Sequence, residues 1–430
     1  MIVNREHIGI FGKMNAGKSC VMNLLTQQET SIVDETPGTT ADTKITLQEI
    51  HGLGPVKLFD TAGLDEINEL GNKKRKKVLS TLKECDLILL VLDSHTYNLE
   101  TEKTVIEKAR ELDKQIIVIY NIFDNDNDND NDNDKDNDND IKTRINTCEE
   151  CLPLLRFYQK IAISAVKPSN RQPLLNFILK HYVSKKIHTD LLPFIKHDEF
   201  YILNIPMDDE TPPGRYLRPQ AMCEEYITRN WAYPVSYRMN LAKARSKDKA
   251  EFERFNDFIN SFKKRPRVII TDSQAMDIMK NWTPADIKLT TFSIMMINYM
   301  SNGKLSDFVK GVKQLDSLKH GDKILIVEAC NHSRIGEDIG LVQIPNYFKK
   351  HHPDIIIEHN FGREFQENEK LSEYKLIIHC GGCMITPQKL SARLRDLATL
   401  GLPYTNYGVL LSYIQGQETL NRALEVWDIT

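Results

Sequence analysis

The chain has 430 residues, of which 41% are hydrophobic and 27% charged, and its formal net charge is −4. This length predicts a globular protein with about two to four domains. The segment 124–140 carries nine Asp and one Lys, a net charge of −8, which leaves +4 for the rest of the chain. A balance this close to neutral predicts no nucleic-acid partner.

The chain's eight cysteines are dispersed and do not form the dense framework of a disulfide-rich secreted domain. We therefore expect a reducing compartment in which some of the thiols bind metal. No apolar run reaches the roughly 20 residues that span a bilayer, and no secretory signal precedes the first apolar strand. The sequence predicts a cytoplasmic protein without a membrane partner, or a protein of the hydrogenosome or plastid if the source is a eukaryote.

Short apolar strands alternate with helical stretches over residues 8–180. The alternation predicts an α/β domain, 1–184, with a mostly parallel sheet covered by helices on both faces. The predicted strands are Ile8–Phe11, Val56–Phe59, Leu87–Leu92, Ile116–Tyr120 and Ile161–Ser164.

The first strand leads into Gly12–Ser19, a complete G-x-x-x-x-G-K-S/T motif that opens a helix. In this context the backbone N–H groups of the loop wrap phosphates, Lys18 reaches the terminal phosphates and Ser19 binds Mg²⁺. The predicted nucleotide contacts in this segment are Gly12, Asn15, Ala16, Gly17, Lys18, Ser19 and Cys20.

Two further segments carry groups for magnesium and the terminal phosphate. Thr40 lies in a Thr-rich loop and supplies a hydroxyl for the metal shell. Asp60 ends a strand and supplies a carboxylate near the metal, and Gly63 follows it closely enough to approach a γ-phosphate. With Lys18, these three residues are the predicted catalytic set.

Two more motifs lie at the carboxyl ends of later strands. Asn121 and Asp124 form one of them, and Ser164 and Ala165 form the other. Together the five motifs resemble those of the small GTPase superfamily. Their residues are most similar to those of its Era/TrmE-like branch. The resemblance implies binding of GTP and GDP with Mg²⁺, slow and switch-like hydrolysis of GTP to GDP and phosphate, and recognition of guanine by the Asp124 carboxylate.

Three positions refine this resemblance. Leu64 stands where a water-orienting glutamine would be needed, which agrees with slow hydrolysis. Asn15 matches a loop asparagine that helps to hold K⁺ in this branch, and a loop-stabilising role is the alternative. Ile122 replaces the usual Lys of the Asn-Lys-x-Asp motif, which leaves the guanine affinity open.

The Asp/Asn run 124–140 cannot bury a core and repels itself, so a disordered insertion is expected. Cys148 and Cys151 follow it on a predicted helix, and we interpret them as incidental thiols.

Residues 185–265 form a second predicted unit, a small α/β dimerisation or interaction domain, with a plain connecting subdomain as the alternative. Its elements are Tyr201–Ile205, Pro219–Asn230, Val235–Arg238 and Asp248–Lys263.

A third unit, 266–430, again alternates strands and helices and predicts a doubly wound α/β domain. Its strand Ile324–Ala329 leads into Cys330 and His332, and its strand Leu376–His379 leads into Cys380 and Cys383. Zinc and iron–sulfur clusters both use such ligands. Three thiolates from two strand ends suit a 4Fe-4S cluster with one open iron, while zinc and unliganded core cysteines remain alternatives.

The C-x-H and H-C-x-x-C pair behind an Era-like domain resembles the HydF family, the GTPase maturation factors of FeFe-hydrogenase. The resemblance implies a 4Fe-4S cluster on Cys330, Cys380 and Cys383, with His332 or His379 as a fourth ligand or in the outer shell. It implies a homodimeric scaffold that carries the precursor of the diiron subcluster. The implied partners are the radical-SAM maturases HydE and HydG, and apo FeFe-hydrogenase.

Two other hypotheses remain. An Era/TrmE-like GTPase in RNA modification or ribosome assembly, with a zinc-binding accessory domain, requires a basic surface, for which Lys263–Arg265 is the candidate. The other is a redox enzyme that uses the cluster for electron transfer, which a single cluster without a flavin or nicotinamide fingerprint supports least.

Overall fold

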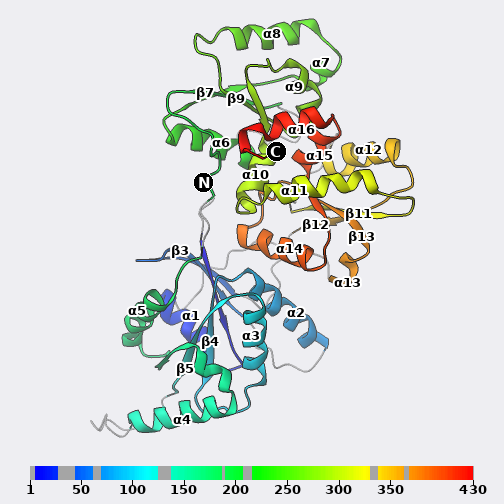
Figure 1. Ribbon diagram of the computed structural model, residues 1–430. Coiled ribbons are helices and arrows are strands. Elements are labelled where there is room, and N and C mark those ends of the chain that lie inside the picture. The colour runs from blue at the N-terminus through cyan, green and yellow to red at the C-terminus, as the bar shows by residue number, and fades with distance from the viewer. Residues whose placement is uncertain are drawn as a thin grey trace. The chain divides into compact units, whose positions relative to one another are not determined.

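The structure is a computed structural model that describes residues 5–27, 44–61, 69–123, 137–185, 189–206, 216–329, 338–362 and 368–429. The chain divides into two compact units, Val3–Lys186 and Ile187–Thr430 together with Met1–Ile2 (Figure 1). Both units are α/β, as the sequence predicts. No helix within the described ranges is both long and apolar enough to cross a membrane.

The first unit is built on one six-stranded sheet of order β2-β3-β1-β4-β5-β6. Every neighbouring pair is parallel except β2 with β3. The sequence analysis missed β2. The strands are β1 Glu6–Phe11, β2 Lys44–Ile50, β3 Gly54–Asp60, β4 Leu87–Asp93, β5 Gln115–Asn121 and β6 Gln159–Ile163.

Helices cover both faces of this sheet. Along β4, Leu89 packs into the apolar cluster that contains α1 and α5, whereas its neighbour Leu90 packs into the cluster that contains α2, α3 and α4. Side chains of a strand alternate between faces, so a strand buried on both sides is continuously apolar. The helices are α1 Lys18–Thr26, α2 Glu69–Glu84, α3 Glu100–Glu111, α4 Asn137–Cys151 and α5 Arg171–His181, with short 3₁₀ turns at Pro153–Phe157 and Pro168–Asn170.

Helix α4 begins inside the Asp/Asn run, so the expectation that all of 124–140 is disordered is wrong for Asn137–Asp140. Arg144 pairs with Asp140 one turn earlier in this helix. Acidic residues also favour the positive end of the helix dipole, so the end of the run suits a helix start. Cys148 and Cys151 lie on this helix, as predicted.

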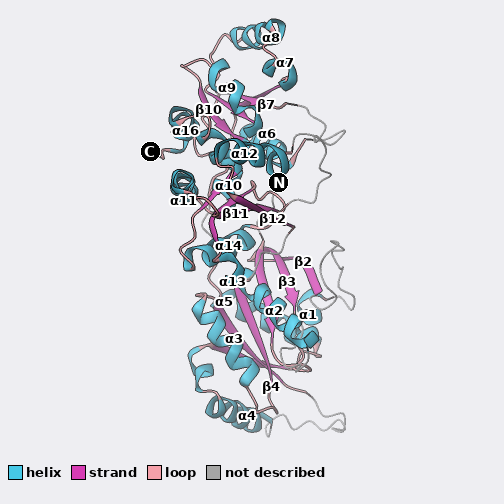
Figure 2. Ribbon diagram, turned by 90° about the vertical axis from the view of Figure 1, so that its right-hand side faces the viewer, coloured by secondary structure: helices cyan, strands magenta, loops and turns pink. Residues whose placement is uncertain are grey.

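The second unit contains two four-stranded parallel sheets (Figure 2). The first has the order β10-β9-β7-β8, and the second has the order β12-β11-β13-β14. The strands are β7 Phe200–Asn204, β8 Tyr233–Tyr237, β9 Val268–Thr271, β10 Lys288–Thr291, β11 Lys323–Glu328, β12 Ile356–Phe361, β13 Tyr374–His379 and β14 Tyr404–Asn406.

The helices of this unit lie between and around the two sheets. They are α6 Arg218–Arg229, α7 Leu241–Arg245, α8 Lys249–Asn260, α9 Met276–Trp282, α10 Phe292–Met300, α11 Leu305–Val312, α12 Ile344–His351, α13 Asn368–Leu371, α14 Pro387–Thr399, α15 Tyr407–Tyr413 and α16 Gln417–Leu424. Short 3₁₀ turns occur at Ser273–Ala275, Lys313–Ser317 and Glu425–Trp427, and a π-helical turn occurs at Ile339–Gln343.

The predicted boundary between 265 and 266 cuts through the first of these sheets. Strand β9 pairs with β7 from Tyr201↔Val268 to Asn204↔Thr271, so Val268–Thr271 belongs with the preceding strands. A four-residue strand carries no information about its partners, and β7 lies more than 60 residues before β9, so the sequence alone did not reveal this pairing.

One continuous apolar core joins the two sheets. Helix α10 is buried on nearly all sides, with Ile294, Met295 and Met296 fully enclosed. A Cβ atom at Gly408 in α15 would lie 2.9 Å from the backbone nitrogen of Ile294, so this glycine permits the close approach of the two helices. The core positions the carboxyl ends of strands from both sheets around one cavity, described below.

Candidate functional site: a nucleotide loop and a thiol cavity

The nucleotide loop connects β1 to α1, in the strand–loop–helix arrangement that the motif requires. Gly12 has a φ of +150°, and a Cβ atom there would lie 2.2 Å from the carbonyl oxygen of Val91. Gly17 has a φ of +94°, and its Cβ would lie 2.1 Å from Nδ2 of Asn121. Both positions therefore require glycine, and the backbone N–H groups at the start of α1 form an anion-binding turn.

The predicted phosphate and magnesium groups converge at this turn. Nζ of Lys18 donates a 2.7 Å hydrogen bond to the carbonyl oxygen of Lys13 across the loop. Oγ of Ser19 donates a 2.7 Å hydrogen bond to Oδ2 of Asp60 at the end of β3. The hydroxyl and the carboxylate are thus close enough to share one cation.

Asn121 connects the nucleotide loop to the loop after β6. Its Nδ2 donates to the carbonyl oxygen of Ala16, and its Oδ1 accepts from the N–H of Ala165, each at 3.1 Å. Asn121, Ser164 and Ala165 are all buried. The structure thus brings together three segments that the sequence analysis assigned to one nucleotide site.

Other predicted residues are placed less tightly or lie outside the described ranges. Asn15 is exposed, and its backbone has a left-handed conformation with a φ of 62°. Cys20 is half-buried on α1. The predicted residues outside the described ranges are Thr40, Gly63, Asp124, Cys330 and His332.

One residue that supports the loop was not predicted from the sequence. Glu102 of α3 is buried, and its Oε1 accepts a 3.1 Å hydrogen bond from the N–H of Lys13. A glutamate in the first turn of an amphipathic helix is usually solvated, so the sequence carried no signal for this contact.

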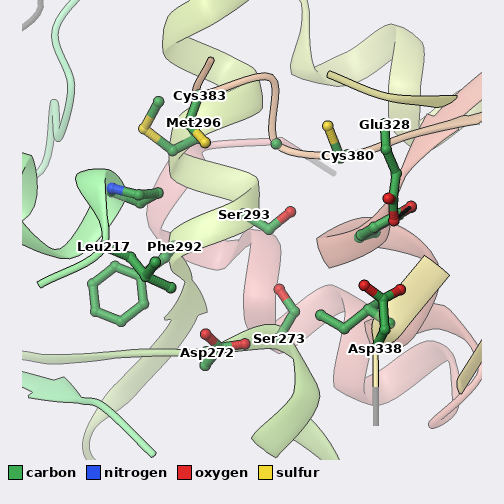
Figure 3. A pocket seen from close by; sticks show the side chains of 14 residues that line it. Leu217, Asp272, Ser273, Phe292, Ser293, Met296, Glu328, Asp338, Cys380 and Cys383 are labelled. Carbon is green, nitrogen blue, oxygen red and sulfur yellow. Dashed lines mark hydrogen bonds between the residues drawn. The ribbon is translucent and has the colours of Figure 1, made fainter. Parts of the chain in front are cut away.

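The second site is a cavity of about 170 Å³ between the two sheets of the second unit. Cys380 and Cys383 line one side, and Asp272, Ser273 and Asp338 line the other (Figure 3). Most of the polar lining comes from the carboxyl ends of strands, where parallel sheets place their ligands. The remaining lining residues are Leu217, Pro219, Phe292, Ser293, Met296, Glu328, Ile339, Gly381 and Tyr407.

Both thiols have polar neighbours suited to negative sulfur. Sγ of Cys380 accepts a 3.3 Å hydrogen bond from the N–H of Ala329, the last described residue before Cys330. The guanidinium of Arg218 donates to the carbonyl oxygen of Cys383. Burial lowers the pKa of Arg218, and the nearby Cys383 opposes that shift.

His379 does not line the cavity. It is buried, with Nδ1 2.7 Å from the carbonyl oxygen of Cys380 and Nε2 3.0 Å from Nη1 of Arg393. Because the arginine can only donate, Nε2 accepts and Nδ1 carries the proton. Both ring nitrogens are thus engaged within the protein fold.

Beside Cys380, the cavity lining carries a buried hydrogen bond between Tyr407 and Glu328, with 2.7 Å from the phenol oxygen to Oε1 (Figure 3). Burial and the neighbouring carboxylate raise the pKa of Tyr407 well above its usual range. Neither residue was predicted from the sequence. A charged residue at the end of the apolar run Ile324–Val327 was the available signal, because such a residue emerges at a strand's carboxyl end.

No three Cys, His, Asp or Glu side chains among the described residues come close enough to hold a single metal ion. Cys380 and Cys383 fit a thiolate-bound cluster, because both line the cavity and a backbone N–H donates to the sulfur of Cys380. These two residues are accordingly the described part of a candidate cluster site.

Comparison with protein families divides the chain into three parts. Residues 7–122 match the 50S ribosome-binding GTPase family, 191–300 the hydrogen maturase F dimerization domain, and 306–426 the hydrogen maturase F tetramerization domain. The thiol cavity takes its lining from both of the latter regions.

Individual relatives match the first unit. GTPase Der of a Nitratiruptor species is 36% identical over 121 residues, 28% of this chain and 26% of that protein. The tRNA modification GTPase MnmE of Desulforamulus reducens is 32% identical over 184 residues, 42% of this chain and 35% of that protein. The chain thus spans only about a quarter to a third of the length of these relatives.

Among solved structures, Era of Aquifex aeolicus bound to GDP and aluminium fluoride is 24% identical, with a TM-score of 0.34. The match covers 43% of this chain and 59% of that one. By its sequence family the first unit is a GTPase domain, and both parts of the second unit match hydrogen maturase F domains. The chain belongs to the HydF family of hydrogenase maturation GTPases.

Proposed function

We propose that this protein is a GTP-hydrolysing scaffold that carries a 4Fe-4S cluster, assembles the diiron subcluster and delivers it to apo FeFe-hydrogenase. The observation that carries the proposal is the thiol cavity between the two hydrogen maturase F regions, in a chain that begins with a GTPase domain. A nucleotide site and a separate cargo site in one chain are what a switch-controlled carrier requires.

In the nucleotide site, Ser19 and Asp60 hold Mg²⁺, joined by Thr40, and Lys18 binds the terminal phosphates. Magnesium neutralises the charge that develops on the phosphate oxygens during hydrolysis. Gly63 approaches the γ-phosphate, Asp124 recognises guanine, and Asn15 adds a ligand for K⁺. The bond between Ser19 and Asp60 supports this assignment, because it joins the two magnesium ligands already.

In the cavity, Cys380 and Cys383 hold the cluster together with Cys330. Such a cluster supplies an iron that can accept an incoming ligand when only three thiolates bind it. His379 acts from the outer shell in this proposal, because both of its ring nitrogens have partners within the fold. His332 remains a candidate for the fourth position.

The partners follow from the family. HydE and HydG would supply the ligands of the diiron precursor, and apo FeFe-hydrogenase would receive the product. The dimerization and tetramerization domains support self-association, starting with a homodimer. The RNA-modification alternative gains nothing from residues 191–426, where the hydrogen maturase F domains match.

Activation of apo FeFe-hydrogenase in a mixture with HydE and HydG tests the proposal. The wild-type chain should activate the hydrogenase, and Cys380→Ser and Ser19→Ala should each reduce activation strongly. Cys223→Ala, which changes a buried thiol outside the cavity, should activate normally. Full activation by Cys380→Ser would show that the thiol cavity does not carry the cargo.

A further inference from the structure

The segment that follows β5 carries an aromatic side chain to which the proposed function assigns no role. Phe123 lies two positions beyond Asn121, the last residue of that strand. Its side chain is half-buried, yet it is not among the described side chains that pack against either apolar cluster of the first unit. Since ligand sites are lined mostly by apolar and aromatic side chains, a ring outside the core and beside the nucleotide loop is suited to cover part of the ligand.

The ring of Phe123 lies against the nucleotide loop. A Cβ atom on Gly17 would lie 2.1 Å from Nδ2 of Asn121 and 3.6 Å from Cζ of Phe123. The amide and the ring therefore flank the same glycine. Gly17 directly precedes α1, whose first N–H groups form the anion-binding turn, so the ring lies at the loop that holds the phosphates.

The backbone after β5 explains why Phe123 reaches this loop and Ile122 does not. The N–H of Ile122 donates a 2.9 Å hydrogen bond to the carbonyl oxygen of Ile163, which extends the pairing of β5 with β6. Side chains alternate along an extended strand, so Asn121 and Phe123 share one side. Alternation thus assigns the contact with the loop to Phe123, and not to the isoleucine that departs from the Asn-Lys-x-Asp motif.

The loop after β6 carries a second apolar side chain outside the core. Val166 is 62% exposed and follows Ala165, whose N–H donates to Oδ1 of Asn121 at 3.1 Å. Asn121 thereby ties the carboxyl ends of β5 and β6 together, which is where parallel sheets place their ligands. Phe123 and Val166 supply apolar surface at these two ends, and apolar surface suits the flat faces of a nucleotide base.

We propose that Phe123 stacks on the guanine base and supplies the main apolar contact of the base site, with Val166 beside it. Stacking on an aromatic ring uses the face of a base, which every base has, and not its hydrogen-bonding edge. Phe123 therefore strengthens the binding of guanine without reading its edge. This inference rests on the nucleotide site of the proposed function and is independent of the thiol cavity.

The affinities of three ligands for the full chain test the inference. GDP carries guanine, inosine diphosphate lacks the exocyclic amine of guanine, and ribose 5-diphosphate has no base. Each ligand competes with a fluorescent GDP analogue in the presence of Mg²⁺. Phe123→Ala should weaken the binding of GDP and of inosine diphosphate by about tenfold each, as the loss of one stacking contact would give, and should leave ribose 5-diphosphate binding unchanged. Phe123→Tyr keeps the ring and should bind all three ligands as the wild type does.

Ile122→Ala is the matched control, because it truncates the neighbouring apolar side chain, and it should bind GDP nearly as well as the wild type. Equal losses for GDP and ribose 5-diphosphate in Phe123→Ala would show that the ring supports the loop and would overturn the inference. Unchanged GDP binding in Phe123→Ala, or an equal loss in Ile122→Ala, would also overturn it. In these cases the wild type still binds GDP and the proposed function stands, whereas a wild-type chain that binds no GDP would overturn both.

Discussion

The hydroxyl of Ser19 donates a 2.7 Å hydrogen bond to Oδ2 of Asp60 and so connects the first turn of α1 to the end of β3. The two residues come from motifs 41 positions apart, and both were predicted from the sequence as magnesium groups. Their contact defines where the cation would bind, because Mg²⁺ takes a hydroxyl and a carboxylate that can approach the same point.

Ser19→Ala should weaken magnesium-dependent GTP binding by about tenfold or more, since it removes one oxygen from the site. Ser19→Thr, which keeps the hydroxyl, serves as the matched variant and should bind nearly normally. Titration of a fluorescent GTP analogue with and without Mg²⁺ measures both. Equal magnesium dependence of the alanine variant and the wild type would contradict the assignment.

Asn121→Ala should destabilise the GTPase domain by about 2–4 kcal/mol, because it leaves a carbonyl of Ala16 and an N–H of Ala165 unpaired in a buried place. Thermal unfolding of the full chain, followed with and without GTP, measures the effect. Asn23→Ala changes an exposed position of α1 and should be nearly neutral. A loss of GTP affinity without a loss of stability would show that Asn121 acts mainly on the ligand.

Gly382→Ala should cost about 1–2 kcal/mol, because Gly382 has a φ of +70° that residues with a Cβ rarely adopt. Gly381→Ala should cost little, since a Cβ there meets Met296 at an ordinary 3.6 Å. The midpoints of thermal unfolding of the two variants provide the comparison. The same loss at both positions would mean that the turn, and not the left-handed backbone, limits stability.

Alkaline pH should destabilise the chain in part through Cys148. Burial, followed by the smaller influence of Cys151 and nearby carboxylates, raises the pKa of the Cys148 thiol from 9.0 to about 11. The folded state holds this proton more tightly than the unfolded state does. The thiol therefore contributes fully to the stability of the fold below about pH 9, and this contribution is lost as pH rises to about 11. Urea unfolding of wild type and Cys148→Ala across this range should show a shallower pH dependence for the variant, and identical slopes would contradict the shift.

The sequence predicted the local features of the first unit well, because each of its motifs carries its own signal. The glycines of the nucleotide loop, for example, are required by contacts that any such loop makes. The sequence could not assign β9 to its sheet or identify β14, because a strand of three or four residues does not specify its partner. Ser273 was missed for a related reason, since its place in the lining of the thiol cavity depends on how two sheets pack.

We propose that Cys380 and Cys383, with Cys330, hold a 4Fe-4S cluster in the cavity between the two sheets. Electron paramagnetic resonance and iron and zinc analysis of the anaerobically reconstituted chain would detect this cluster. We expect a reduced-cluster signal and about four irons per chain in the wild type and in Cys223→Ala, with both lost in Cys380→Ser. Zinc in place of iron, or a cluster signal that Cys380→Ser leaves intact, would contradict it.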